Sequence, residues 1–397
     1  MTSFQDESYS LAPHKVLKRL EKPCLYDIEN DELYELSEDA FRFLLQCSLG
    51  KKPSVRQEDE EFIQYCLSEK LISVSGTPIA RGVISVPSPV PSLRYLELQI
   101  TDRCNLRCRH CYLGDGRHRD LPLNTIEKVF VEFEEIQGLR LLLSGGEPLL
   151  HPHFWRINEV LENYAFRSVL LSNGTLIDRE SARRLRVHEV QISLDGMKEG
   201  HEAIRGQDTY DRAIRAIDRL QEVGIRVSIA TMIHHKNLQE FERLASLIRS
   251  KNIEEWNVDL PCIEGRLKDN RDSWVSPAEA GRFLQYGYGG GLHSSGENST
   301  CGVHLCAIMP PGMVAKCGLF RAEPVGSVEE GLRVCWERIP RISLQDLACH
   351  CGEMEACRGG CRYRAKGYGG LYHPDPLQCY ARGVLRGGED HDDSESL

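Results

Sequence analysis

Residues 95–112 have the sequence YLELQITDRCNLRCRHCY, and this stretch decides the fold. It starts with an alternation of apolar and polar side chains that predicts a β-strand. Cys104, Cys108 and Cys111 follow at C-x3-C-x2-C spacing. Three thiolates on such a loop can hold three irons of a [4Fe–4S] cluster and leave the fourth iron open to a chelating substrate. A zinc site would need a fourth ligand, and His110 is awkwardly placed for it, directly beside Cys111.

Around this stretch the chain alternates short β-rich runs with helical patterns. The apolar stripe of residues 124–137 predicts one helix, and the stripe of residues 238–248 predicts another. Six strand–helix units in a row predict a parallel α/β sheet, either open or closed into a partial barrel, and we expect a partial TIM-like (βα)6 barrel. The six predicted strands are Tyr95–Ile100, Leu139–Leu143, Ser168–Leu171, Glu189–Ser193, Arg226–Ala230 and Glu255–Asp259.

Composition narrows the class of protein. The 397 residues include 41% apolar side chains, enough for two or three domains, and carry a net charge of −10, which argues against a broad nucleic-acid-binding face. We find neither a signal peptide nor an apolar run long enough to cross a bilayer, so we expect a cytoplasmic protein without membrane contact. A reducing compartment rarely keeps disulfides, and eleven of the 16 cysteines have metal-ligand spacings. The other five (Cys24, Cys47, Cys66, Cys262 and Cys335) are interpreted as packing residues.

The cysteine loop resembles that of the radical S-adenosylmethionine (SAM) superfamily, and later motifs extend the resemblance. Ser144-Gly145-Gly146-Glu147-Pro148 is similar to the family's GGEP motif, and residues 171–175 and 193–206 resemble its ribose and carboxylate contacts. The resemblance implies that Glu147 binds the SAM amino group, Ser193 the ribose and Arg205 the carboxylate. The full implied SAM-binding set is Tyr112, Gly145, Gly146, Glu147, Ser172, Asn173, Ser193 and Arg205. The family's chemistry is reductive cleavage of SAM to a 5′-deoxyadenosyl radical that abstracts a substrate hydrogen. Because the cofactor carries this hard step, no Ser–His–Asp set is expected.

A second cysteine set towards the C-terminus resembles the SPASM domain, which carries two auxiliary [4Fe–4S] clusters. Three clusters per chain are then expected. Family topology implies Cys301, Cys306, Cys317 and Cys361 for the first auxiliary cluster, and Cys349, Cys351, Cys357 and Cys379 for the second. The chain departs from the family's C-x2-C where it has Cys349-His350-Cys351, which makes the place of Cys349 less secure. Eight thiolates could also bind two zinc ions.

The N-terminal part resembles the winged-helix-like peptide-recognition domain typified by the pyrroloquinoline quinone chaperone. Alternating strands around residues 23–36 precede two helices, the first capped by Ser37. Such a domain captures a leader peptide by strand addition. A DNA-binding winged helix is disfavoured, because residues 1–80 carry nine Lys and Arg against fifteen Asp and Glu. A purely structural role for this domain stays open.

We therefore expect four parts: a peptide-recognition domain at 1–85, a radical SAM barrel at 93–266, a SPASM domain at 267–386 and an acidic disordered tail at 387–397. The predicted function is a peptide maturase that crosslinks or otherwise oxidises a precursor peptide, with ferredoxin or flavodoxin as electron donor. The alternative is a small-molecule substrate, such as a porphyrin in haem biosynthesis. Sulfatase maturation is disfavoured, because Gly318 stands where those enzymes carry an aspartate. A non-catalytic electron carrier would not need the SAM-binding motifs.

Overall fold

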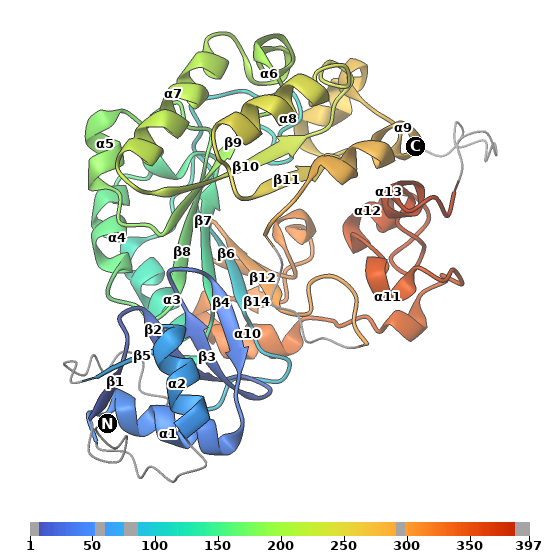
Figure 1. The fold of residues 1–397 in the computed structure, drawn as a ribbon. Coiled ribbons are helices and arrows are strands. Elements are labelled where there is room, and N and C mark those ends of the chain that lie inside the picture. The colour runs from blue at the N-terminus through green and yellow to red at the C-terminus, as the bar shows by residue number, and fades with distance from the viewer. Residues whose placement is uncertain (1–7, 52–59, 75–85, 117, 291–297, 386–397) are drawn as a thin grey trace.

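The computed structural model describes residues 8–51, 60–74, 86–116, 118–290 and 298–385. The predicted acidic tail and the predicted wing after the second helix lie outside these residues. The chain forms an α/β barrel with an N-terminal unit below it and a cysteine-rich C-terminal segment beside it (Figure 1). No helix among the residues described is long and apolar enough to cross a membrane.

The centre of the molecule is a nine-stranded sheet with the order β11-β10-β9-β8-β7-β6-β12-β13-β14. Its first six members in chain order run parallel, as predicted, and each lies within two residues of its predicted ends. These strands are β6 (Tyr95–Thr101), β7 (Arg140–Gly145), β8 (Arg167–Ser172), β9 (Glu189–Ser193), β10 (Arg226–Met232) and β11 (Trp256–Asp259).

Helices cover the outer face of the parallel strands (Figure 1). On β6 the side chains of Leu96, Leu98 and Ile100 are fully buried in the core with those of the helices, whereas Glu97 lines the barrel interior. Each such apolar side chain contributes about 1.5–3 kcal/mol on burial, which is why alternation along the strand selects one register. The helices are α3 (Leu123–Glu135), α4 (Phe154–Leu161), α5 (Arg179–Arg184), α6 (Lys198–Arg205), α7 (Thr209–Glu222) and α8 (Phe241–Ser250).

Three short strands beyond the predicted six extend the sheet past β6. The first, β12, pairs parallel to β6, and β13 and β14 follow antiparallel. A helix after them, α10, packs on α3, so residues 305–339 share the core of the barrel. The bounds are β12 (Leu305–Met309), β13 (Met313–Ala315), β14 (Gly326–Ser327) and α10 (Leu332–Arg338).

The rest of the C-terminal segment consists of short helices beside the mouth of the barrel. One residue, Arg364, fastens them to β11: it donates to Asp375 Oδ1 at 2.8 Å and to Asp259 Oδ1 at 2.9 Å. Arg364 and Asp375 are both buried, so this pair holds a segment that has little apolar core of its own. The helices are α9 (Pro277–Ala280), η6 (Gly281–Tyr286), α11 (Met354–Cys357), α12 (Arg362–Gly367) and α13 (Pro376–Ala381).

The N-terminal unit, meaning the described residues before Val86, holds two small sheets and two helices. The predicted hairpin and both helices are present, and Ser37 Oγ accepts the Ala40 amide at the start of α1, as predicted. Strands β1, β2 and β5 were not predicted. The elements are β1 (Tyr9–Leu11), β2 (Lys15–Arg19), β3 (Pro23–Asp27), β4 (Glu32–Glu35), α1 (Glu38–Ser48), α2 (Glu60–Ser68) and β5 (Ile72–Val74).

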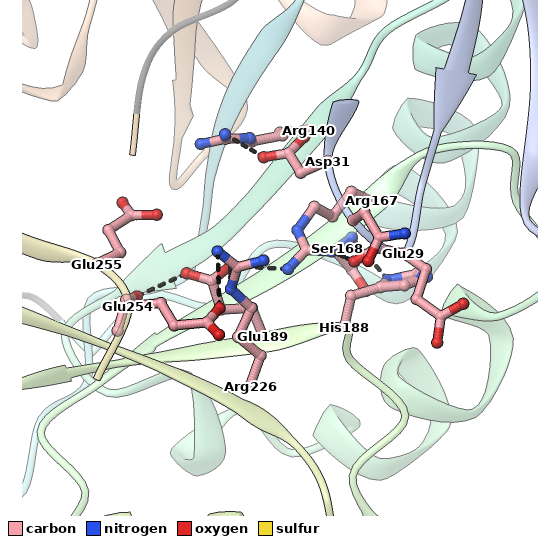
Figure 2. Close-up of polar contacts among 12 residues, drawn as sticks. Glu29, Asp31, Arg140, Arg167, Ser168, His188, Glu189, Arg226, Glu254 and Glu255 are labelled. Carbon is pink, nitrogen blue, oxygen red and sulfur yellow. Dashed lines mark hydrogen bonds and ion pairs between the residues drawn. The ribbon is translucent and has the colours of Figure 1, made fainter. Parts of the chain in front are cut away.

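Buried charges join this unit to the amino ends of the barrel strands (Figure 2). Asp31, in the turn between β3 and β4, pairs with Arg140 at the start of β7. Arg167, at the start of β8, donates to the carbonyls of Ile28 and Glu29 at 2.8 and 2.6 Å. The N-terminal unit is therefore docked at the end of the barrel opposite the carboxyl ends of its strands.

Candidate functional site

A cavity of about 460 Å³ opens where the parallel strands end. The carboxyl ends of neighbouring parallel strands meet at one edge of the sheet, which is where βα barrels assemble their sites. The cavity contains every residue of the implied SAM-binding set except Glu147, which lies fully buried directly behind it. Its sequence-predicted lining residues are Cys104, Cys108, Cys111, Tyr112, Gly145, Gly146, Ser172, Asn173, Ser193, Arg205 and Cys361.

The loop of Cys104, Cys108 and Cys111 follows β6 directly and turns all three residues to the cavity. Its backbone is held against the next strand. An added Cβ on Gly145 would lie 2.2 Å from the carbonyl oxygen of Thr101, and one on Gly146 would lie 2.3 Å from that of Arg103. Such distances exclude any side chain, so both glycines are needed for the cysteine loop to sit on the end of β7.

The three thiols are close enough to influence one another. Burial raises the pKa of the Cys108 thiol; the Arg205 guanidinium opposes this, and Cys111 adds to it. Cys104 Sγ accepts the amide of Leu106 at 3.4 Å. Cysteine binds a metal as the thiolate, so metal binding at this loop would release the proton that burial holds on the Cys108 thiol.

Glu147 links the ends of two strands. Its carboxylate accepts the hydroxyl of Ser172 at 2.9 Å and the amide of Asn173 at 2.9 Å. Burial raises the pKa of Glu147 to about 7, although these hydrogen bonds oppose the shift. Among the described residues Glu147 forms no salt bridge, and Arg205 lowers its pKa less than the hydrogen bonds do, so a positively charged ligand in this region would stabilise its ionised form.

The side chains of the β8 turn hold each other in place. Asn173 Oδ1 accepts the hydroxyl of Thr175 at 2.6 Å, and Asn173 Nδ2 donates to Asn105 Oδ1 at 3.1 Å. Asn105 belongs to the cysteine loop, so the turn after β8 and the loop after β6 position one another. On the opposite wall, Tyr112 Oη accepts from Gln99 Nε2 at 2.9 Å.

Arg205 lies between the cysteine loop and a buried carboxylate. Its Nε is 2.6 Å from Asp195 Oδ2, and its Nη1 is 4.0 Å from Cys108 Sγ. The Arg205 charge holds the pKa of Asp195 below its usual range against strong desolvation. His110 Nε2 is 3.7 Å from the same carboxylate. Neither Asp195 nor His110 was predicted as a site residue; the available signal was that Asp195 lies two residues after the end of β9.

The second cysteine set forms two groups. In the first, Cys361 interacts with Cys301 and Cys317, and its thiol forms a hydrogen bond with Cys262. Cys306 lies elsewhere: it is fully buried in β12, beside Cys335.

The second group brings together the four cysteines of the second predicted set. Cys379 interacts with Cys349, Cys351 and Cys357, so the Cys349-His350-Cys351 step brings both of its thiols to the group. The Gly359 amide donates to Cys357 Sγ at 3.3 Å.

Backbone N–H groups approach several of the cysteine sulfurs. Within the described ranges, no three His, Cys, Asp or Glu side chains converge on one point as a zinc ion requires. Cluster thiolates instead bind separate irons, and amide hydrogen bonds to their sulfurs are usual. Such N–H donors approach Cys104 and Cys357, as described, and Cys301, which accepts the Arg362 amide at 3.4 Å.

Comparisons with known proteins agree with this geometry. The chain is 28% identical over 324 residues to the mycofactocin maturase MftC of Mycolicibacterium smegmatis, covering 71% of this chain and 81% of the relative. It is 29% identical over 339 residues to the AdoMet-dependent heme synthase of Methanosarcina barkeri, covering 73% and 97%. The fold matches Streptococcus suis SuiB bound to S-adenosylmethionine with a TM-score of 0.65, at 16% identity over 92% of this chain and 98% of SuiB.

The family comparison covers the part of the chain that builds the cavity. Residues 98–248 match the radical SAM superfamily, a range that contains the three-cysteine loop, both cavity glycines, Glu147 and Arg205. The same range forms β6 to β10 of the barrel. Residues 98–248 of this chain, which supply most of the predicted SAM site, are therefore similar to the radical SAM superfamily.

Proposed function

We propose that this radical SAM enzyme is a peptide maturase that oxidatively modifies a precursor peptide. The observation that carries the proposal is the combination of a SAM-type cavity with two further cysteine groups and a docked N-terminal unit. The relatives support it: MftC is named a maturase, and SuiB has been solved bound to its precursor peptide SuiA. The SuiB match leaves 8% of this chain uncovered, which is about 32 of 397 residues. The part of the chain that precedes β6 is longer than this, so the match must extend into it. The shared fold therefore includes part of the N-terminal unit.

The residues of the cavity would hold SAM around the three cysteines. When bound there, the [4Fe–4S] cluster supplies the electron that cleaves SAM to methionine and the radical that abstracts a substrate hydrogen. Glu147 is placed to stabilise the SAM ammonium, because its buried carboxylate has a raised pKa that a neighbouring cation would relieve. Arg205 would bind the SAM carboxylate while Asp195 fixes its orientation. Ser193 and Tyr112, which both line the cavity, would contact SAM, Ser193 at the ribose.

The two C-terminal cysteine groups would hold auxiliary clusters that accept the electron released when the peptide is oxidised. The first of them shares the wall of the cavity through Cys262 and Cys361. A short distance between the bound peptide and this cluster would favour transfer of the electron. Ferredoxin or flavodoxin would supply the electron that starts each turnover.

The N-terminal unit would bind the leader of the precursor. Among the described residues, β4 pairs with β3 alone, so its other edge is open to an added strand. The buried charges shown in Figure 2 would keep this leader site at a constant distance from the barrel, so that the leader positions the core peptide.

The test is direct modification of a peptide. Full-length, iron-reconstituted chain is incubated anaerobically with SAM, dithionite and the peptide fraction of the source cells, and products are followed by mass spectrometry. We expect one short peptide to lose mass in two-hydrogen steps, or to lose CO2 as well, with formation of 5′-deoxyadenosine. The variant with Cys104, Cys108 and Cys111 all changed to Ala is the control and should give neither product. It should also hold about 8 irons per chain where the wild type holds about 12, if three cubanes are present.

A haem-pathway function has one specific observation in its favour, the alignment over 97% of the Methanosarcina barkeri heme synthase. The same assay with iron coproporphyrin in place of peptides distinguishes the two. Decarboxylation of the porphyrin, with every peptide unchanged, would overturn the maturase proposal.

A further inference from the structure

Cys262 lies where the barrel meets the C-terminal segment. It follows β11 by three residues, lines the cavity and forms a hydrogen bond through its thiol with Cys361. Its spacing in the sequence gave no sign of this role, because the next cysteine along the chain is Cys301.

The contact between these two cysteines is built into the fold. Arg364, in the first turn of α12, donates to Asp259 Oδ1 at 2.9 Å and to the carbonyl of Leu260 at 3.2 Å. Asp259 precedes Cys262 by three residues, and Arg364 follows Cys361 by three. The same Arg364 pairs with Asp375, whose Oδ2 also accepts the amide of Cys361 at 2.8 Å. One buried guanidinium thus aligns both thiols.

Two further thiols complete the group. The side chain of Lys316 interacts electrostatically with Cys301, Cys317 and Cys361, which places these three around one cation. Backbone amides of residues 319 and 320 donate to Cys317, and that of Arg362 donates to Cys301 at 3.4 Å. Amide donors and nearby cations stabilise thiolates, as expected of cluster ligands.

Cys306 has a different environment. It belongs to β12, opposite Leu96 of β6, and its side chain is fully buried in the apolar core of the barrel. Its neighbours are Cys335 and the carboxylate of Glu97.

We propose that Cys262, together with Cys301, Cys317 and Cys361, forms the four-thiolate site of the first auxiliary cluster, and that Cys306 is a core residue. This inference rests on the auxiliary clusters of the proposed function and changes one ligand of the set implied by family topology. Ligation by Cys262 makes the end of β11 part of both the cluster site and the cavity wall, so the cluster borders the substrate.

The experiment uses the full chain with Cys104, Cys108 and Cys111 changed to Ala, so that only auxiliary clusters remain. Cys262→Ala and Cys306→Ala are added separately, and each protein is reconstituted anaerobically. Iron and acid-labile sulfide per chain are measured together with the EPR spectrum after reduction. The background variant should hold about 8 irons in two clusters. Cys262→Ala should lose between one and all of the irons of one cluster and change its EPR signal. Cys306→Ala should keep the iron content and spectrum of the background.

A loss of iron must be distinguished from a loss of folding. Urea unfolding followed by circular dichroism shows whether each variant is folded. If Cys262→Ala does not fold, Cys262→Ser is used, since an oxygen ligand should shift one EPR signal and leave the other unchanged. Unchanged iron and spectrum in both Cys262 variants would overturn the assignment, as would an equal loss in Cys306→Ala. A background variant without iron would show that the auxiliary clusters themselves are absent, which is a failure of the proposed function and is distinguishable from a wrong ligand.

Discussion

Arg205 and Asp195 form a buried ion pair whose Nε–Oδ2 distance is 2.6 Å, directly beside the sulfur of Cys108. Asp195 Oδ1 also accepts the amide of Met232 at 2.8 Å, so the pair joins the end of β9 to the end of β10. A carboxylate with no exposed surface is thus held ionised by one guanidinium at the mouth of the barrel.

Replacing Asp195 by Ala should destabilise the apo chain strongly. It leaves the Arg205 charge buried without its partner, and breaking such a pair costs about 3–5 kcal/mol. The measurement is the free energy of unfolding in urea, followed by circular dichroism. The matched control is Asp211→Ala, which removes the surface partner of Lys198, a pair about half exposed on both sides. Because water screens this pair, the change should have a far smaller effect. Equal effects of the two changes would contradict the interpretation.

Glu147→Gln should weaken SAM binding. The amide keeps the size of the carboxylate but lacks the charge, and it cannot accept from both Ser172 and Asn173 through two oxygens. A hydrogen bond to a charged group contributes about 1.5–3 kcal/mol, so the Kd for SAM should rise by about 10- to 100-fold. Equilibrium dialysis of the reconstituted chain measures it. Glu162→Gln, at an exposed position after α4, should leave the Kd unchanged. Unchanged SAM affinity in Glu147→Gln would remove this residue from the site.

Gly146→Ala should displace the cysteine loop. The added Cβ would lie 2.3 Å from the Arg103 carbonyl oxygen, a backbone atom that cannot turn aside. We expect the iron of the radical cluster to be lost, about 4 per chain, with the auxiliary iron retained. Gly367→Ala is the control, because a Cβ there meets nothing within 4 Å. Full iron content in Gly146→Ala would show that the loop tolerates the methyl group.

Stability should rise with pH above 8 through Lys18. Its ammonium is buried in β2 against the barrel, where it donates to the carbonyls of Gly138 at 3.0 Å and Ala165 at 2.7 Å. Burial lowers the pKa of Lys18 to about 8, with Glu134 partly opposing the shift, against 10.5 for an ordinary lysine. Between these values the unfolded chain binds more protons than the folded one, so the free energy of unfolding increases with pH.

Between pH 8 and pH 10 the Lys18 contribution to the free energy of unfolding should rise by about 1.4 kcal/mol per pH unit. Below pH 8 this slope should vanish, because Lys18 is protonated in both the folded and the unfolded chain. The stability of the wild type relative to Lys18→Met, measured in urea at pH 7, 8.5 and 10, isolates this contribution. Lys22→Met, which removes an exposed surface pair with Glu35, provides the control and should give no such slope. A wild-type advantage over Lys18→Met that is independent of pH would contradict the prediction.

The predicted elements that proved correct share one physical property, which is a strong local pattern. The alternation along β6 and the apolar stripe of α3 each select one face for burial, and a shift of one residue would expose that face. Strands β13 and β14 were missed because they have only three and two residues, and β12 because it stands between cysteines and a Pro-Pro-Gly turn rather than before a helical pattern. Strand β2 was missed because Lys18 within it suggests a solvated face. Only the barrel beneath this strand supplies the carbonyl groups that accept hydrogen bonds from the Lys18 ammonium.

By itself, the sequence determined that this chain is a βα barrel with a radical SAM cysteine loop, because ligand spacing and strand alternation are local properties. It also predicted which cysteines form groups wherever those residues are neighbours in the chain. Only the tertiary structure decided that Cys262 lies beside Cys361 while Cys306 is buried in the barrel core. The physical reason is that both placements depend on segments far apart in the chain. Arg364 joins the segment of Cys361 to that of Cys262, and the pairing of β12 with β6 buries Cys306. Neither contact leaves a periodic signal in the chain.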